Sequence, residues 1–135
     1  MRRWIMAVAV LPLLAGCAGW TTPSCPTGLK PMTEADLYFG RNIGDTSAVS
    51  DDDWQRFVDQ EITPRFPDGL TVEEATGQWK GADGAIVHEA SKRLIVILSG
   101  APGEADKLGS IRTAYKRRFH QDAVLLLETK SCGSF

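Results

Sequence analysis

Two runs of five consecutive apolar residues constrain the fold of this chain more than any other feature. They are Leu94–Leu98 and Ala123–Leu127, both short and dominated by Leu, Ile and Val, which is typical of buried strands. Side chains alternate between the two faces of a strand, so an unbroken run places apolar groups on both faces. We therefore expect a sheet covered by helices on one face, with a second face that needs another cover.

Two amphipathic helices are predicted between the strands. Ser50 precedes Asp51–Asp53, which places a hydroxyl N-cap and acidic residues at the positive end of a helix dipole. Pro64 is expected to end this helix. A second helix is predicted over Glu104–Phe119. The apolar residues at helical spacing are Trp54, Phe57, Val58 and Ile62 in the first helix, and Leu108, Ile111, Tyr115 and Phe119 in the second.

The remaining strand signals complete the order of elements. Leu37–Gly40 predicts a short first strand, and Leu70–Trp79 predicts a strand that a turn at Gly81–Gly84 joins to the next one as a hairpin. The order is β-α-β-β-α-β, which predicts an α+β, ferredoxin-like domain: a four-stranded antiparallel sheet with both helices on one face. In this topology the last strand lies antiparallel beside the first.

The N-terminal residues are typical of a targeting signal rather than of a part of the folded domain. Arg2 and Arg3 precede the apolar run Trp4–Leu14, whose eleven residues are too few for a helix across a bilayer of about 30 Å. Residues 1–16 are therefore predicted to be a signal peptide. The segment Leu14–Cys17 resembles the bacterial lipobox, in which a cysteine after small residues becomes lipidated.

Cys17 is accordingly predicted to carry a lipid that attaches the protein to a membrane. In lipoproteins, a residue other than Asp after the lipidated cysteine, here Ala18, implies the outer membrane of a two-membrane bacterium. We expect a protein of the bacterial cell envelope that faces the periplasm. The alternative is an ordinary secretory peptide in which the cysteine occurs by chance.

The two other cysteines are expected to form a disulfide. Cys25 and Cys132 form a pair once Cys17 is lipidated, and the envelope is an oxidising compartment. The chain end after the last strand should lie near the segment that enters the first strand, so the two residues are expected to lie close together. Two free, buried thiols remain the alternative.

The rest of the chain divides into a tether and one domain. Residues 17–33 contain Pro23, Pro26 and Pro31 and are predicted to form neither helix nor strand, which leaves 34–135 as a single α+β domain. The 135 residues include 15 basic and 17 acidic ones, and loss of residues 1–16 changes the formal net charge from −2 to −4. This charge argues against a nucleic-acid partner.

Candidate catalytic groups are few. His88 and His120 have no Cys, Asp or Glu at metal-ligand spacing, and neither a nucleophile elbow nor a phosphate-binding loop occurs, so we predict no metal and no cofactor. His120 is expected to end the second helix in a left-handed conformation. Tyr38, Arg41, Trp79 and His88 are the residues that could meet in a pocket, because the end of the first strand and the long hairpin can converge.

Two hypotheses follow for function. The first is an envelope lipoprotein whose domain is a non-catalytic binding or dimerising module, with the apolar second sheet face covered by another copy of the chain. That face could also be covered by the tether with Trp20 or by a ligand. The second is a small periplasmic enzyme or ligand-binding domain that uses the pocket of the four residues named above.

Several segments also carry a resemblance to a known family. They are Leu37–Arg41, Trp54, Thr63–Val72, Gly77–Trp79, Tyr115–Phe119 and Cys132. They resemble a family of small bacterial secreted or lipid-anchored proteins known only as a domain of unknown function, over about residues 25–135. The resemblance implies a shared fold and an envelope location, but no catalytic residue, substrate or cofactor. His120 departs from it, since glycine is expected after the helix.

Overall fold

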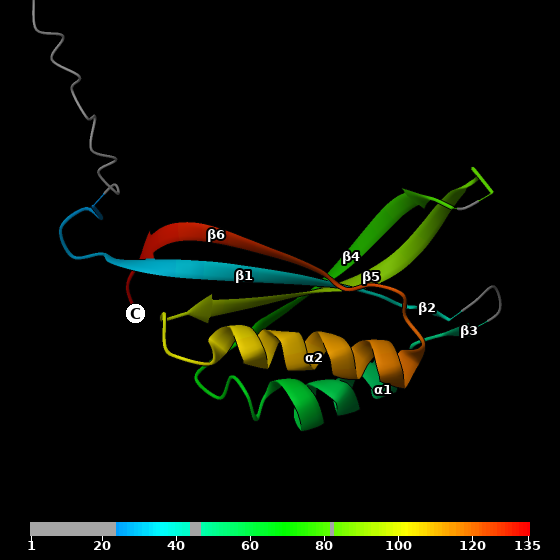
Figure 1. The fold of residues 1–135 in the computed structure, drawn as a ribbon, viewed down its shortest axis with the longest axis horizontal. Coiled ribbons are helices and arrows are strands. Elements are labelled where there is room, and N and C mark those ends of the chain that lie inside the picture. Colours follow the sequence, from blue (N-terminus) through cyan, green and yellow to red (C-terminus); the bar gives the residue numbers. More distant parts are fainter. Residues whose placement is uncertain (1–23, 44–46, 82) are drawn as a thin grey trace, which may run out of the picture.

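The computed structural model describes residues 24–43, 47–81 and 83–135 and confirms the predicted α+β architecture (Figure 1). The elements in chain order are β1 (Lys30–Gly40), β2 (Asn42–Ile43), β3 (Ser47–Ala48), α1 (Asp51–Phe57), the π-helix η1 (Val58–Ile62), β4 (Thr71–Lys80), β5 (Ile86–Leu98), α2 (Glu104–Phe119) and β6 (Leu125–Gly133). The small β2–β3 hairpin, which the sequence did not predict, lies between the first strand and the first helix.

The four long strands form one antiparallel sheet in the order β4-β5-β1-β6. The first and last strands therefore lie side by side, as predicted. Leu37 of β1 stands between Leu94 of β5 and Leu126 of β6, and all three point to the face that carries the helices. Because side chains alternate, Asp36, Tyr38 and their neighbours point to the other, open face.

Both helices cover the same face of the sheet (Figure 1). The apolar residues predicted for both helices are all buried in the core between helices and sheet. Aromatic rings dominate the centre of this core: Phe39 lies 5.1 Å from Trp54 and 4.7 Å from Tyr115, measured between ring centroids. The spacing of apolar residues along the chain is therefore sufficient to predict this face of the domain.

The first helix begins and ends where the sequence predicts. Ser50 caps it by accepting the backbone N–H of Asp53 at 3.1 Å. The helix widens into η1, in which Thr63 donates to the carbonyl of Val58, and the helical backbone stops two residues before Pro64. At the far end of α2, His120 takes the expected left-handed conformation, with φ of 54°.

The structure moves the start of the domain to an earlier residue. β1 begins at Lys30, so the last four residues of the predicted tether belong to a strand. Lys30 to Thr33 pair with Gly133 to Lys130 of β6, and this pairing overrides the local effect of Pro31. Pro31 is the second residue of the strand, where only β6 flanks β1. Residues 1–23, with the predicted signal peptide, Cys17 and Trp20, lie outside the described residues.

The predicted disulfide joins Cys25 to Cys132, with a Cα–Cα distance of 5.6 Å. Cys132 lies within β6 rather than beyond it, directly opposite Pro31 of β1. The disulfide therefore fastens the segment before β1 to the end of the last strand. Within the described ranges, no helix is long and apolar enough to cross a membrane.

Candidate functional site

A hollow of about 1110 Å³ lies on the open face of the sheet. It is found where the β4–β5 hairpin rises away from β1 and β6 (Figure 1). Its lining comes from the strands, from the β2–β3 hairpin and from the loop after α2: Tyr38, Gly40, Asn42, Ala48, Trp79, Val87, Glu89, Ser91, His120, Gln121, Asp122, Ala123 and Leu125. Three segments that are distant in sequence thus meet around one cavity.

Two of the four residues predicted for a pocket line this hollow. Tyr38 stands opposite Leu125 in the sheet, and Trp79 stands opposite Val87 near the tip of the hairpin. The Trp79 side chain is 52% exposed, which is unusual for the largest apolar residue. The hollow therefore offers two aromatic rings from different strands to any molecule that enters it.

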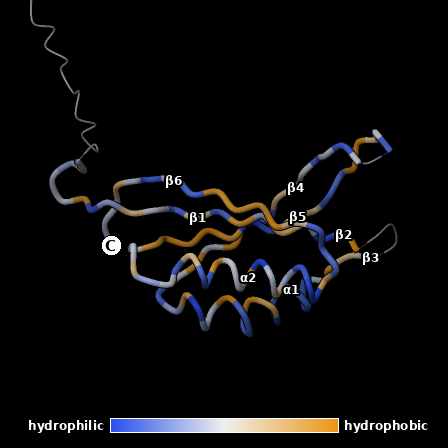
Figure 2. The backbone as a smooth tube through the Cα atoms, in the orientation of Figure 1, coloured by the Kyte–Doolittle hydropathy of each residue, from blue (hydrophilic) through white to orange (hydrophobic). Residues whose placement is uncertain are grey.

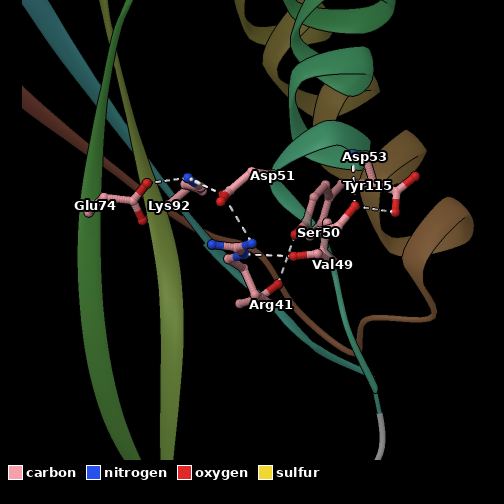
Figure 3. Close-up of polar contacts among 9 residues, drawn as sticks. Arg41, Val49, Ser50, Asp51, Asp53, Glu74, Lys92 and Tyr115 are labelled. Carbon is pink, nitrogen blue, oxygen red and sulfur yellow. Dashed lines mark hydrogen bonds and ion pairs between the residues drawn. The ribbon is translucent and has the colours of Figure 1, made fainter.

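The other two predicted pocket residues do not line the hollow. Arg41 turns to the helix side, where its Nε donates to the carbonyl of Val49 at 2.8 Å and its guanidinium pairs with Asp51 at 3.1 Å (Figure 3). His88 stands opposite Gln78 on β4. Its side chain points to the other face of the sheet from those of its neighbours Val87 and Glu89, which line the hollow. Strand alternation is the reason in both cases, since adjacent residues on a strand point to opposite faces.

Glu89 is a lining residue that the sequence analysis missed. One carboxylate oxygen accepts the backbone N–H of Asn42 at 3.0 Å. The carboxylate lies against Gly40, where a Cβ atom would come within 2.6 Å of Oε1. Gly77 stands directly opposite Glu89 on β4. A glycine inside a strand, here Gly40, indicates a close approach of other atoms, and this signal could have identified the position.

Asn42 and Gln121 hold together the part of the hollow formed by β2 and by the loop after α2. The Asn42 side chain donates to the carbonyl of His88, and the Gln121 amide donates to the carbonyl of Asn42. These bonds connect β2, the β4–β5 hairpin and the loop after α2. The backbone that positions Glu89 is therefore tied to two neighbouring elements.

The charges on the open face are arranged in two groups. Arg93 pairs with Glu34 at 3.6 Å, Asp36 at 2.7 Å and Glu73 at 3.0 Å, and the hydrogen bond to Asp36 contributes most to the raised pKa of Arg93. The hollow itself contains the carboxylates of Glu89 and Asp122, and none of its described lining residues is Lys or Arg. The hollow thus combines aromatic rings with uncompensated negative charge.

A separate charged cluster lies on the helix side of the sheet and holds elements of the fold together (Figure 3). The buried Lys92 ammonium binds Asp51 at 3.0 Å and also contacts Glu74. Hydrogen bonding to Lys92, followed by the charge of Arg41, lowers the pKa of Asp51. Since Asp51 is the first residue of α1, the cluster fastens the start of this helix to β4 and β5.

An apolar stripe runs along the open face from Leu125, which lines the hollow, to residues outside it. Ile97, Leu125 and Leu127 are 39%, 53% and 47% exposed, and the hydropathy colouring shows apolar stretches along β5 and β6 (Figure 2). The prediction that the unbroken apolar runs leave side chains on a second face is confirmed. In the described ranges, no three His, Cys, Asp or Glu side chains are grouped so that they could hold a metal ion.

Residues 34–135 match the family described as "Protein of unknown function (DUF3574)". The chain belongs to this family. The match covers the sheet from the fifth residue of β1, both helices and the whole lining of the hollow. No curated protein matches the chain.

Two solved structures are similar to the DUF3574 domain. One is titled "Phage SAM lyase in complex with S-methyl-5′-thioadenosine", with 17% identity and a TM-score of 0.60, covering 77% of this chain and 90% of that one. The other is titled "Phage SAM lyase in apo state", with 19% identity and a TM-score of 0.57, covering 85% of this chain and 95% of that one. At these identities the likeness shows a shared fold.

Proposed function

We propose that this domain binds a small molecule with a flat ring, of the methylthioadenosine type, in the hollow on its open sheet face. The observation that carries the proposal is the exposed Trp79 ring, which shares a hollow of about 1110 Å³ with Tyr38. Cavities of about 300–1,000 Å³ hold small ligands, and a flat ring gains by stacking on an aromatic side chain. The hollow is large enough for a nucleoside.

The similar structures support the ligand class. A protein with this fold has been solved in complex with S-methyl-5′-thioadenosine, according to its title. The hollow in this chain also offers polar groups for a ribose, since Asn42, Glu89, Ser91 and Gln121 line it. An aromatic surface with a few polar groups is what orients a nucleoside.

Isothermal titration calorimetry of the full chain with S-methyl-5′-thioadenosine tests the proposal. Trp79→Ala is expected to weaken binding about tenfold, because stacking of a base on an aromatic ring is worth about 1–3 kcal/mol. Ile86→Ala is the matched control, since Ile86 is equally exposed on the same hairpin but lies outside the hollow. Absence of binding, or equal losses in the two variants, would overturn the proposal.

We further propose that the domain works in the bacterial cell envelope, attached to the outer membrane by a lipid on Cys17. The lipobox-like segment and the Cys25–Cys132 disulfide support this location, because disulfides persist in oxidising compartments. Fractionation should recover the protein with outer membranes, and Cys17→Ser should release it from them. Recovery of both forms in the soluble fraction contradicts the anchor.

A second candidate function is self-association across the open face. The exposed Ile97, Leu125 and Leu127 favour it, since an apolar patch on a folded domain usually marks a partner surface. Sedimentation analysis of the full chain in detergent should give the mass of a dimer, and Leu127→Glu should give that of one subunit. A single-subunit mass for the unaltered chain excludes this candidate.

A further inference from the structure

Glu89 has no cationic partner among the described residues, unlike the carboxylates that β1 and β4 place on the open face. Glu34, Asp36 and Glu73 all pair with the Arg93 guanidinium. Glu89 accepts only the Asn42 N–H within the described part of the chain. A carboxylate in a partly enclosed site without a counter-ion attracts a cation from solution.

The surroundings of Glu89 hold its carboxylate in place and leave it accessible. Gly40 supplies space beneath the carboxylate, because any Cβ there would overlap both carboxylate oxygens, at 2.6 and 2.7 Å. Glu89 itself lines the hollow and is half-buried. Trp79 lies on the same face two residues beyond Gly77, the residue opposite Glu89 on β4, so its ring is the diagonal neighbour of Glu89.

We propose that the hollow selects small organic cations, a sulfonium or quaternary ammonium group attached to a flat ring, with Glu89 as their counter-ion. This inference rests on the proposed function and names the ligand class of the same site. The rings of Tyr38 and Trp79 supply negative faces, and a cation held by both a ring and a carboxylate is bound more tightly than its neutral analogue. The absence of Lys and Arg from the described lining also favours a positively charged ligand.

The test compares two ligands that differ by one methyl group and one charge. S-methyl-5′-thioadenosine is a neutral thioether, and 5′-deoxy-5′-dimethylsulfonioadenosine is the corresponding sulfonium cation. Calorimetry with the full chain at low salt should give about tenfold tighter binding of the sulfonium, with the difference shrinking as salt is added. Equal affinities would overturn the inference while leaving the proposed function intact, and no binding of either ligand would overturn both.

Three variants test the role of Glu89 as the counter-ion. Glu89→Gln should bring the two affinities together while the thioether still binds. Gly40→Ala should do the same, because the new methyl group displaces the end of a flexible side chain rather than backbone. Gly77→Ala is the matched control and should keep the tenfold preference, since the nearest atom to its Cβ lies 4.0 Å away. If Glu89→Gln keeps the preference, Glu89 is not the counter-ion.

Discussion

The hydroxyl of Tyr115 on α2 donates a 2.8 Å hydrogen bond to the carbonyl oxygen of Gly40, the last residue of β1. Tyr115 is fully buried, and Gly40 lines the hollow. The centre of the aromatic core is therefore connected directly to the backbone on which Glu89 rests. This relationship shows how packing beneath the sheet positions groups on its open face.

Loss of the Tyr115 hydroxyl should destabilise the domain. Tyr115→Phe is expected to lower the free energy of unfolding by about 1 kcal/mol in urea denaturation, because the Gly40 carbonyl loses its donor. Tyr38→Phe is the control, since the Tyr38 hydroxyl has no partner among the described residues. Equal effects of the two changes would show that the bond to Gly40 contributes nothing.

The same tyrosine should make the domain sensitive to alkaline pH. Burial raises the pKa of Tyr115 in the folded protein. In the unfolded chain a tyrosine loses its proton near pH 10, about its usual pKa. The contribution of the protonated Tyr115 to stability is therefore complete below about pH 10 and is lost as the pH rises further. Denaturation curves should show this loss in the unaltered protein and less of it in Tyr115→Phe.

Glu104 should stabilise the start of α2. Its carboxylate accepts the backbone N–H groups of Ser99 and Gly100 at 3.1 and 2.9 Å, together with the Ser99 hydroxyl. Burial acts to raise the pKa of Glu104, but these hydrogen bonds outweigh it and lower the pKa. The stabilisation is present above the usual pKa of 4.5 and disappears as the pH falls through the lowered value.

Glu104→Gln is therefore expected to lower the free energy of unfolding by about 1 kcal/mol at pH 7, measured by thermal denaturation. It should also reduce the loss of stability as the pH falls into the acid range. Asp106→Asn serves as the comparison, because Asp106 lies in the same first helical turn without these bonds. A similar loss from both changes would mean that only the helix dipole is involved.

Removal of the disulfide should have the largest single effect on stability. Cys25 and Cys132 are 107 residues apart, and the chain-entropy treatment gives about 4.7 kcal/mol for a closed loop near that length. Replacement of both cysteines by Ser should lower the urea midpoint strongly, and the unaltered protein in reductant should behave the same way. An unchanged midpoint would show that the sheet holds this end without the bond.

The Lys92 cluster should tolerate loss of its cation better than loss of its anions. Lys92→Met leaves only the exposed carboxylates of Glu74 and Asp51, so the free energy of unfolding should change by less than about 1 kcal/mol. Asp51→Asn combined with Glu74→Gln leaves a buried ammonium unpaired and should lower the urea midpoint more. Adding Lys92→Met to that double variant should restore it, and failure to do so would contradict this account.

Local patterns were sufficient for the elements and for the helix-covered face of the sheet. Ser50 capped the first helix, His120 ended the second, and the spacing of Trp54 and Phe57 placed them in the core. These features depend on neighbours within a few residues, and such short-range effects are what residue order encodes directly. The apolar runs likewise predicted a second face with exposed apolar groups.

Features that depend on partners far along the chain were decided by tertiary structure. Lys30 joined a strand because β6 offered it a backbone partner, although the local sequence favours a tether. Tyr38 and Trp79 met in one hollow, whereas Arg41 and His88 did not, because strand register and alternation set the face of each residue. Glu89 gained its position because Gly40 on β1 leaves room for its carboxylate. Such contacts join residues many positions apart, and only the folded sheet brings them together.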